Sequence, residues 1–275
     1  MSTQIETALN YWHDRLSKEY GEDKILNITL YGSQNYNIDT LYSDVDVKAI
    51  FIPSLKEAIL TNKRLSLTLH NEKNEHCEIK DIREMFEMYK KQNINFLETL
   101  FTPYRWENPN YPAIHAMLHN NAEKISHYNR YSCVRSLCGQ AKNAIIFIRD
   151  YPTDNKKIAN VYYFYLFLNK YLQNIDYKKC LYVEDSEKIF NIPAREMLIA
   201  LKEKDDSTLA SLIPEYHHFF ESSLTFLKEF FTFLPTCPYP WTWLADKTVP
   251  DLLDNIAFDT IQIYEQIKGD KNGNT

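Results

Sequence analysis

Glycine is scarce in this chain: only five of its 275 residues are glycine. Because glycine loses much conformational freedom on folding, we expect each ordered glycine in such a chain to have a backbone reason. Gly32 follows an apolar stretch and is the candidate for such a role. Gly269 and Gly273 lie in a polar C-terminal stretch that we expect to be disordered.

Paired cysteines and long apolar runs are also missing. The five cysteines are an odd number, are scattered and form no CxxC pair, which argues against a disulfide framework and a zinc knuckle. No run approaches the ~18 apolar residues that span a bilayer, so we expect no membrane association. The first residues, Met1 to Gln4, lack the apolar core of a signal peptide, so we expect a cytoplasmic location.

A net positive charge is missing as well. The formal charge is −6, so no general basic field attracts nucleic acid, although a local basic groove remains open. The chain is 44% hydrophobic and 25% charged, which is ordinary for a globular protein. A length of 275 residues allows one large domain or two small ones.

The periodicity of the chain changes near residue 112. Before it, alternating or β-branched stretches predict strands, and apolar residues at helical spacing predict helices at 5–20 and 82–91. The predicted strands are 24–31, 45–52, 77–82 and, more weakly, 65–70. The later helical stretches are 113–150, 156–174, 194–204, 214–234 and 249–268. We therefore predict an α+β fold: a small mixed sheet with flanking helices at 1–110, an all-helical domain at 111–268, and a disordered tail at 269–275.

The most informative residues surround the end of the first predicted strand. Gly32 and Ser33 end it, and eleven residues after Ser33 come Asp44 and Asp46 at the start of the next apolar stretch. In a strand these two aspartates would point the same way, roughly 6–7 Å apart along the chain. Carboxylates held so close repel unless a cation lies between them, and hard oxygen donors suit Mg²⁺. The pattern predicts a metal site beside a phosphate-binding turn, in which Gly32 lets the backbone approach the phosphate.

A third carboxylate from a neighbouring strand would complete such a site. We choose Glu78, because it lies at the start of the next clear strand. Asp81 is the alternative, three residues further on and therefore on the opposite face. The other interpretation of the whole pattern is a surface turn followed by two solvated aspartates. Aspartate is depleted in strands, which favours the functional interpretation.

The run GSQNYNIDTLYSDVDVKAIFIPS resembles the signature of the DNA polymerase β-like nucleotidyltransferase superfamily. It is most similar to small bacterial and phage-encoded predicted nucleotidyltransferases, whose motif reads roughly GSxxYGxxTxxSDxDxxxIFxPS. The matching positions are Gly32, Ser33, Tyr36, Thr40, Ser43, Asp44, Asp46 and Ser54. The similarity continues in EIKDIREMFEMYKKQNINFLETLF and spans residues 30–101. The family's glycine after the tyrosine is Asn37 here, and asparagine tolerates left-handed backbone angles.

The resemblance implies Asp44 and Asp46 as metal ligands, Glu78 as the third carboxylate, and Gly32 and Ser33 as nucleotide-contacting residues. It implies transfer of a nucleoside monophosphate from a nucleoside triphosphate, such as ATP, to a hydroxyl group with release of pyrophosphate. The cofactor would be Mg²⁺ or Mn²⁺. The acceptor stays open between a small molecule, a protein and an RNA end. The alternative is a catalytically silent protein of the same fold that acts as a binding or antitoxin-like regulatory partner.

Three further features have both a functional and a structural interpretation. Lys142, with Arg135 and Arg149 at seven-residue spacing, could bind the triphosphate or form a solvated helix face. Glu98, with Asn93 and Asn95, could contact substrate or cap and pack a helix. The aromatic stretch from Pro238 to Trp243 could contact a partner or pack over the helices. We assign Lys142 to nucleotide binding and leave the other two open.

Overall fold

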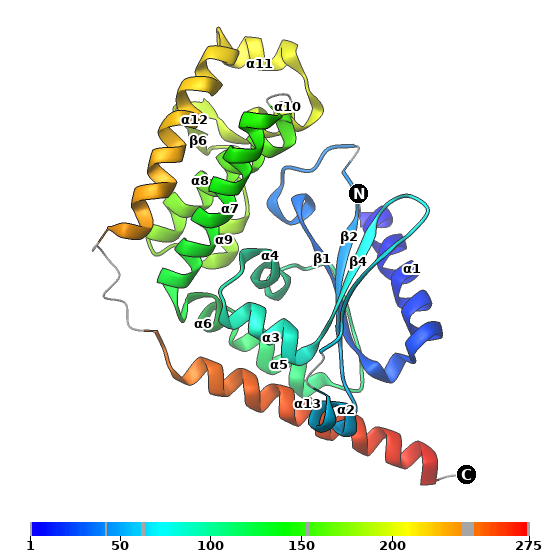
Figure 1. Ribbon diagram of the computed structural model, residues 1–275. Coiled ribbons are helices and arrows are strands. Elements are labelled where there is room, and N and C mark those ends of the chain that lie inside the picture. Colours follow the sequence, from blue (N-terminus) through cyan, green and yellow to red (C-terminus); the bar gives the residue numbers. More distant parts are fainter. Residues whose placement is uncertain (1, 42, 62–63, 152–153, 238–244, 274–275) are drawn as a thin grey trace. The chain divides into compact units, whose positions relative to one another are not determined.

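The computed structural model describes residues 2–41, 43–61, 64–151, 154–237 and 245–273. Its contacts divide the chain into two compact units (Figure 1). Unit 1 comprises residues 1–32, 44–128 and 246–275, and unit 2 comprises residues 33–43 and 129–245. The motif that we predicted to bind the nucleotide is therefore divided between the two units. Its loop belongs to unit 2, and the strands on either side of the loop belong to unit 1.

Unit 1 contains a five-stranded mixed sheet in the order β3-β4-β2-β1-β5. Its strands are β1 (Ile25–Tyr31), β2 (Asp46–Phe51), β3 (Ser66–His70), β4 (His76–Asp81) and β5 (Arg105–Glu107). Only β2 and β4 run parallel, and the other neighbours are antiparallel. The predicted α+β class and mixed sheet are confirmed at this level. The edge strand β5 was not predicted, since three residues give no readable alternation.

Strand alternation gives the sheet two different faces. Val47, Ala49 and Phe51 of β2 point to one face, where the apolar side of α1 (Ser2–Tyr20) covers them (Figure 1). Trp12 and Leu16 of α1 are fully buried in this core. Asp46 and Lys48 alternate with those apolar residues, so the opposite face carries charge.

The charged face of the sheet lies on the side of α3 (Ile82–Lys90) and α4 (Ile94–Leu97) (Figure 1). A 3₁₀ turn, η3 (Glu98–Leu100), follows α4 directly. Met85, Phe86 and Tyr89 of α3 are buried, as their helical spacing predicted. A short connection therefore brings the segment around Glu98 back to the sheet.

Four more helices belong to unit 1. They are α2 (Leu55–Leu60), α5 (Pro112–Asn120), α6 (Ala122–His127) and α13 (Thr248–Gly273). Helix α13 packs against α3 and α5, and its Asp254 pairs with Lys90 of α3 at 2.6 Å. The division at residue 110 placed α5, α6 and α13 with the helical domain, whereas the contacts place them in the same unit as the sheet. Helix α13 also continues through 269–273, within the stretch predicted to be disordered.

The described residues of unit 2 are helical except for connecting segments and one small hairpin. Its elements are η2 (Ser33–Tyr36), α7 (Arg130–Asp150), α8 (Asn155–Leu172), α9 (Tyr177–Leu181), β6 (Lys188–Ile189), β7 (Ile192–Pro193), α10 (Ala194–Glu203), α11 (Asp206–Leu212), α12 (Tyr216–Phe233) and η4 (Leu234–Thr236). The hairpin corrects the all-helical prediction. Phe190 and Asn191 at its turn both have positive φ, the geometry of a two-residue type I′ turn.

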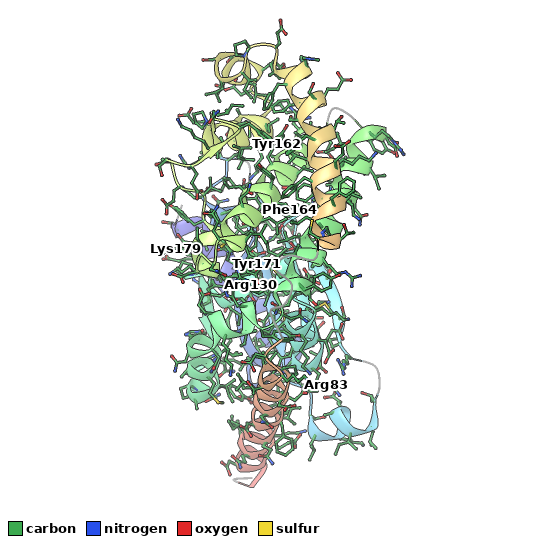
Figure 2. The ribbon with its side chains drawn as sticks, turned by 90° about the vertical axis from the view of Figure 1, so that its left-hand side faces the viewer. Arg83, Arg130, Tyr162, Phe164, Tyr171 and Lys179 are labelled. Atoms are coloured by element: carbon green, nitrogen blue, oxygen red, sulfur yellow. The ribbon has the colours of Figure 1, made fainter. Side chains whose placement is uncertain are left out.

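Helix α8 forms the centre of unit 2. Tyr162, Phe167 and Tyr171 are completely buried along it, and Figure 2 labels two of them. The Arg130 guanidinium donates hydrogen bonds to the Tyr171 carbonyl and to Asn174. Among the described residues, no helix is long and apolar enough to cross a bilayer. All five cysteines are free thiols, as their scattered spacing predicted.

Candidate active site

The turn after β1 has a backbone that only glycine adopts readily. Gly32 has φ +100°, a region that a Cβ atom disfavours. Its N–H donates to Oε2 of Glu98 at 3.0 Å. Glu98 is 1% exposed and lies 66 residues further along the chain, in η3. The turn that we predicted to hold phosphate is therefore fixed by a buried carboxylate.

Asp46 is the first residue of β2 and pairs across the sheet with Tyr31, the last residue of β1. Its Oδ1 accepts the backbone N–H of His76 at 2.9 Å and lies 2.8 Å from Nδ1 of the same residue. The other ring nitrogen of His76 is hydrogen-bonded to the Tyr31 hydroxyl. With Nδ1–H donating to Asp46, Nε2 accepts from Tyr31. This Tyr–His–Asp chain orients the Asp46 carboxylate.

Asp44 lies outside the strand, because β2 begins only at Asp46. It is exposed, whereas Val45 after it is 2% exposed and anchors the chain in the core. Strand alternation, from which we predicted that both carboxylates point the same way, therefore does not extend to Asp44. The two aspartates are two residues apart in the chain, and only Asp46 belongs to the strand.

Glu78 shares the charged face with Asp46 and contacts two lysines there. It lies beside Lys48 in the parallel pairing of β4 with β2. Its carboxylate accepts from the Lys48 ammonium at 2.6 Å and lies 3.2 Å from the Lys80 ammonium. The Lys48 side chain is 3% exposed, and its Nζ lies 3.4 Å from the centre of the Tyr31 ring. Glu78 is thus part of a buried charge network.

The charges of this network shift the pKa values of its members. Burial raises the pKa of the Tyr31 phenol, and the carboxylates of Asp46, Glu78 and Glu98 raise it further. Burial lowers the pKa of Lys48, while Glu78 and Glu98 oppose that shift. Burial alone would raise the pKa of Glu78, but the Lys48 charge and the hydrogen bonds from both lysines lower it overall. Three carboxylates therefore act on one buried phenol.

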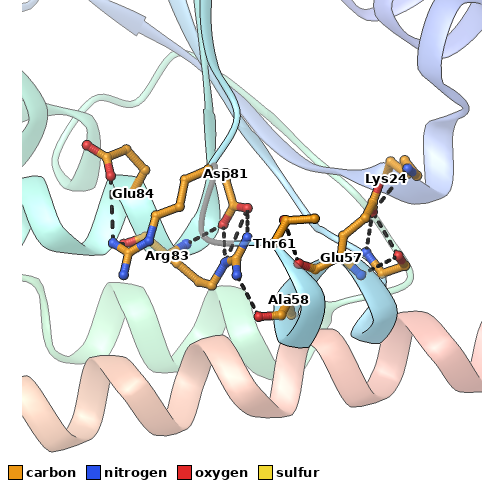
Figure 3. Close-up of polar contacts among 9 residues, drawn as sticks. Lys24, Glu57, Ala58, Thr61, Asp81, Arg83 and Glu84 are labelled. Carbon is orange, nitrogen blue, oxygen red and sulfur yellow. Dashed lines mark hydrogen bonds and ion pairs between the residues drawn. The ribbon is translucent and has the colours of Figure 1, made fainter.

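Asp81, the alternative third carboxylate, has a structural role. It caps the start of α3 by accepting the Arg83 N–H at 2.8 Å, and its carboxylate also binds the Arg83 guanidinium (Figure 3). The Asp81 side chain is 3% exposed. It lies on the apolar face of β4 with Cys77 and Ile79, so alternation separates it from Glu78 as predicted.

The loop between Gly32 and Asp44 is held by helices of unit 2. Asn37 has φ +62°, which confirms the left-handed conformation expected at this position. Its carbonyl accepts from Arg195 of α10 at 2.9 Å, and its side chain donates to the Val183 carbonyl at 2.9 Å. The Tyr36 ring stacks on Tyr163 of α8, with centroids 4.5 Å apart. No sequence signal linked this loop to residues so far along the chain.

A partly buried lysine completes the support of this loop and predicts a pH effect. Lys202 of α10 donates to the Ile38 carbonyl at 2.6 Å. Burial and the Lys156 charge lower the pKa of Lys202 to about 8, against the opposing charges of Asp39 and Glu203. Between pH 8 and 10.5 the unfolded chain binds more protons at this lysine than the folded chain, so stability should rise with pH across that window.

The test compares the free energy of urea unfolding of wild type and Lys202→Met from pH 7.5 to 10.5. The difference between the two proteins should change steadily through this range, because only wild type titrates at the site. Lys188→Met, which removes an exposed lysine of unit 2, should run parallel to wild type. Parallel curves for Lys202→Met would contradict the shifted pKa.

The structure places the remaining predicted residues in different environments. Ser33 begins η2 directly after Gly32 and is partly buried. Lys142 is half-buried on α7 of unit 2, whereas the site carboxylates belong to unit 1. Asn93 caps α4 by accepting the Asn95 N–H at 3.1 Å, which supports the capping interpretation. The aromatic stretch from Pro238 to Trp243 lies outside the described residues.

Sequence reasoning missed the partners of the predicted residues. His76 and Lys48 stand beside Asp46 and Glu78 only because of the sheet register. Within the described part of the chain, no group of three or more His, Cys, Asp or Glu side chains is arranged to hold a metal ion. No protein-family model and no curated protein matches this sequence.

Proposed function

We propose that this chain is a divalent-metal-dependent nucleotidyltransferase that moves a nucleoside monophosphate from a nucleoside triphosphate to a hydroxyl group. The observation that carries the proposal is the pairing of Tyr31 with Asp46. It sets the left-handed Gly32 turn beside the start of β2, where Asp44 and Asp46 lie. A phosphate-sized anion at the turn and a cation at the aspartates would then be neighbours.

The donor set suits Mg²⁺. Magnesium in nucleotide-binding sites uses one or two protein carboxylates together with phosphate oxygens, and Asp44 and Asp46 supply two such carboxylates. Mn²⁺ accepts the same oxygen donors. The bound ion would neutralise the triphosphate and the leaving pyrophosphate. Glu78 fits a ligand role less well, because two ammonium groups already contact it.

In the proposed reaction, different residues of the chain have different roles. The Ser33 hydroxyl binds a phosphate oxygen beside the Gly32 turn, whose own N–H is held by Glu98, and His76 keeps the Asp46 carboxylate in one orientation. The acceptor oxygen forms a bond to the α-phosphorus, the bond from that phosphorus to the bridging oxygen breaks, and pyrophosphate leaves. Glu78 takes the hydroxyl proton in our assignment. Its lowered pKa makes it a weak base, so this contribution is small.

One observation favours the silent alternative. The Glu78 carboxylate is held by Lys48 and Lys80 and would have to exchange those partners to serve a metal ion or an acceptor proton. A protein of this fold that only binds nucleotide needs no such exchange. An active nucleotidyltransferase would transfer label covalently to an acceptor, whereas the silent protein would bind nucleotide without transferring label.

The test incubates the full chain with each α-³²P-labelled nucleoside triphosphate, Mg²⁺ and a cell extract. We expect one labelled species that is absent with heat-inactivated protein. Excess EDTA should abolish the label, and added Mg²⁺ should restore it, because two carboxylates cannot bind the triphosphate without a cation. Nucleotide binding without label in any extract would select the silent alternative. Label that is unchanged by EDTA would contradict the metal-dependent mechanism.

A further inference from the structure

Unit 2 contains a pocket that the proposed chemistry does not use. It lies among α7, α8, α10, α11 and α12 and has a volume of about 830 Å³. That size is within the range of ligand pockets, roughly 300–1,000 Å³. Its floor is apolar and is formed by Ile145, Ile158, Leu201, Leu209 and Phe220, each less than 9% exposed. An apolar body of ligand size would therefore lose water on entering.

The rim of the pocket carries more cations than anions. Its cations are Arg149, Lys204 and Lys228, with His217 nearby, and its carboxylates are Asp206 and Glu221. Arg149 pairs with the adjacent Asp150 at 3.1 Å, and desolvation together with the Asp206 carboxylate raises the pKa of the Tyr216 phenol. Among the described residues, neither Lys204 nor Lys228 forms an ion pair. Two ammonium groups thus stand at the mouth of an apolar cavity without a carboxylate partner.

The position of Lys204 has a conformational cost. It ends α10 with φ +57°, a left-handed conformation that a Cβ atom disfavours. Glycine is the usual residue at such a helix end. The chain places a lysine there, and this lysine lines the pocket. Lys228 approaches from α12, so the two cations come from different elements.

We propose that this pocket binds a small amphipathic anion. Its apolar body, an acyl chain or an aromatic ring system, packs on the floor between α7, α10 and α12. Its single carboxylate, sulfonate or phosphate group pairs with Lys204 and Lys228. The ligand needs both an apolar body and an anionic group. The side chains of the floor form no hydrogen bonds with a polar body, and the rim supplies positive charge. This inference is independent of nucleotidyl transfer.

The test uses 8-anilinonaphthalene-1-sulfonate, a fluorescent probe with an aromatic body and one anionic group, on the full native chain. We expect saturable binding that dodecanoate displaces below its micelle concentration and that dodecyltrimethylammonium does not. The double variant Lys204→Glu/Lys228→Glu should weaken binding of the probe at least tenfold. Lys188→Glu, which changes an exposed lysine of unit 2 that does not line the pocket, should bind as wild type does.

A second variant tests the contribution of the cavity to probe binding separately from that of the lysine charges. Thr225 lines the pocket from an exposed position on α12, so Thr225→Trp should fill the cavity without disturbing the core. We expect it to abolish probe binding while circular dichroism stays unchanged. The proposal is overturned if Thr225→Trp binds the probe normally, if the charge-reversal variant matches Lys188→Glu, or if the cationic amphiphile displaces the probe as well as dodecanoate does.

Discussion

Replacing Asp46 with asparagine should lower the proposed nucleotidyl transfer by about 10²–10³-fold and leave the protein folded. Asparagine retains an oxygen that can accept the His76 N–H, so the local structure persists. It removes the negative charge that a divalent ion requires, and the ion stabilises charge on the transferring phosphate by several kcal/mol. Each loss of about 1.4 kcal/mol in the transition state lowers the rate tenfold.

The measurement is the initial rate of label transfer at saturating nucleotide over a range of Mg²⁺ concentrations. Asp44→Asn should show a loss of the same order, because it removes the other carboxylate of the pair. Glu72→Gln neutralises an exposed carboxylate in the β3–β4 turn and should keep the wild-type rate. If Asp46→Asn matched Glu72→Gln while remaining folded, Asp46 would have no part in the chemistry.

Replacing Lys48 with methionine should destabilise the protein by roughly 2–3 kcal/mol. Removing one partner of a buried ion pair typically costs about 3–5 kcal/mol, and partial exposure of Glu78 reduces that cost. Burial disfavours the Lys48 charge, so its removal has a compensating benefit. The cost prevails because Glu78 would lose its closer cation and keep the Lys80 ammonium at 3.2 Å, and the Lys48 charge would no longer act on the buried Glu98.

A double-mutant cycle tests this network. Lys48→Met/Glu78→Gln should be less destabilised than the sum of the two single variants, because the second change removes the stranded carboxylate. Wild type should lose stability as the pH falls below about 4.5, since the lowered pKa of Glu78 contributes stability only while that group is ionised. Glu78→Gln should lack this contribution. Additive free energies of unfolding would show that Lys48 and Glu78 are not coupled.

Lys56 supplies the matched control for this cycle. It is an exposed lysine on α2, so Lys56→Met should change the free energy of unfolding by less than about 0.5 kcal/mol. Chemical denaturation at pH 7 gives all of these values on one scale. A loss in Lys56→Met equal to that in Lys48→Met would assign the effect to surface charge rather than to the buried pair.

Local patterns predicted the secondary structure of unit 1 well and its tertiary partners poorly. The strands around Ile28 and Val47 were readable because alternation and β-branching are local properties. Strand β5 and the packing of α13 on α3 depend on contacts between segments far apart in the chain. Such contacts leave no periodic signal, so the predicted boundary at 110 assigned α13 to the other domain.

In the candidate site, too, local patterns predicted the backbone better than the tertiary partners. Residue type alone indicated the unusual backbone at Gly32 and Asn37, and both have positive φ. The partners of the site residues, in contrast, depend on the register of the sheet and on contacts between segments far apart in the chain. The Glu98 carboxylate reaches the Gly32 N–H across 66 residues, which no spacing rule could predict. Asp44 lies outside β2 for a local reason, because a strand boundary can lie one or two residues from where alternation suggests.

The interleaved connectivity limits how this gene can be divided. A stop codon after residue 128 would remove α13 and leave the apolar residues of α3 that pack against it without their cover. Expressing residues 129–245 alone would omit the segment 33–43 that stacks on Tyr163 and accepts from Arg195. A recombination that kept unit 2 intact would therefore have to exchange two separate stretches of coding sequence together, so segment 33–43 would be inherited with the helices of residues 129–245.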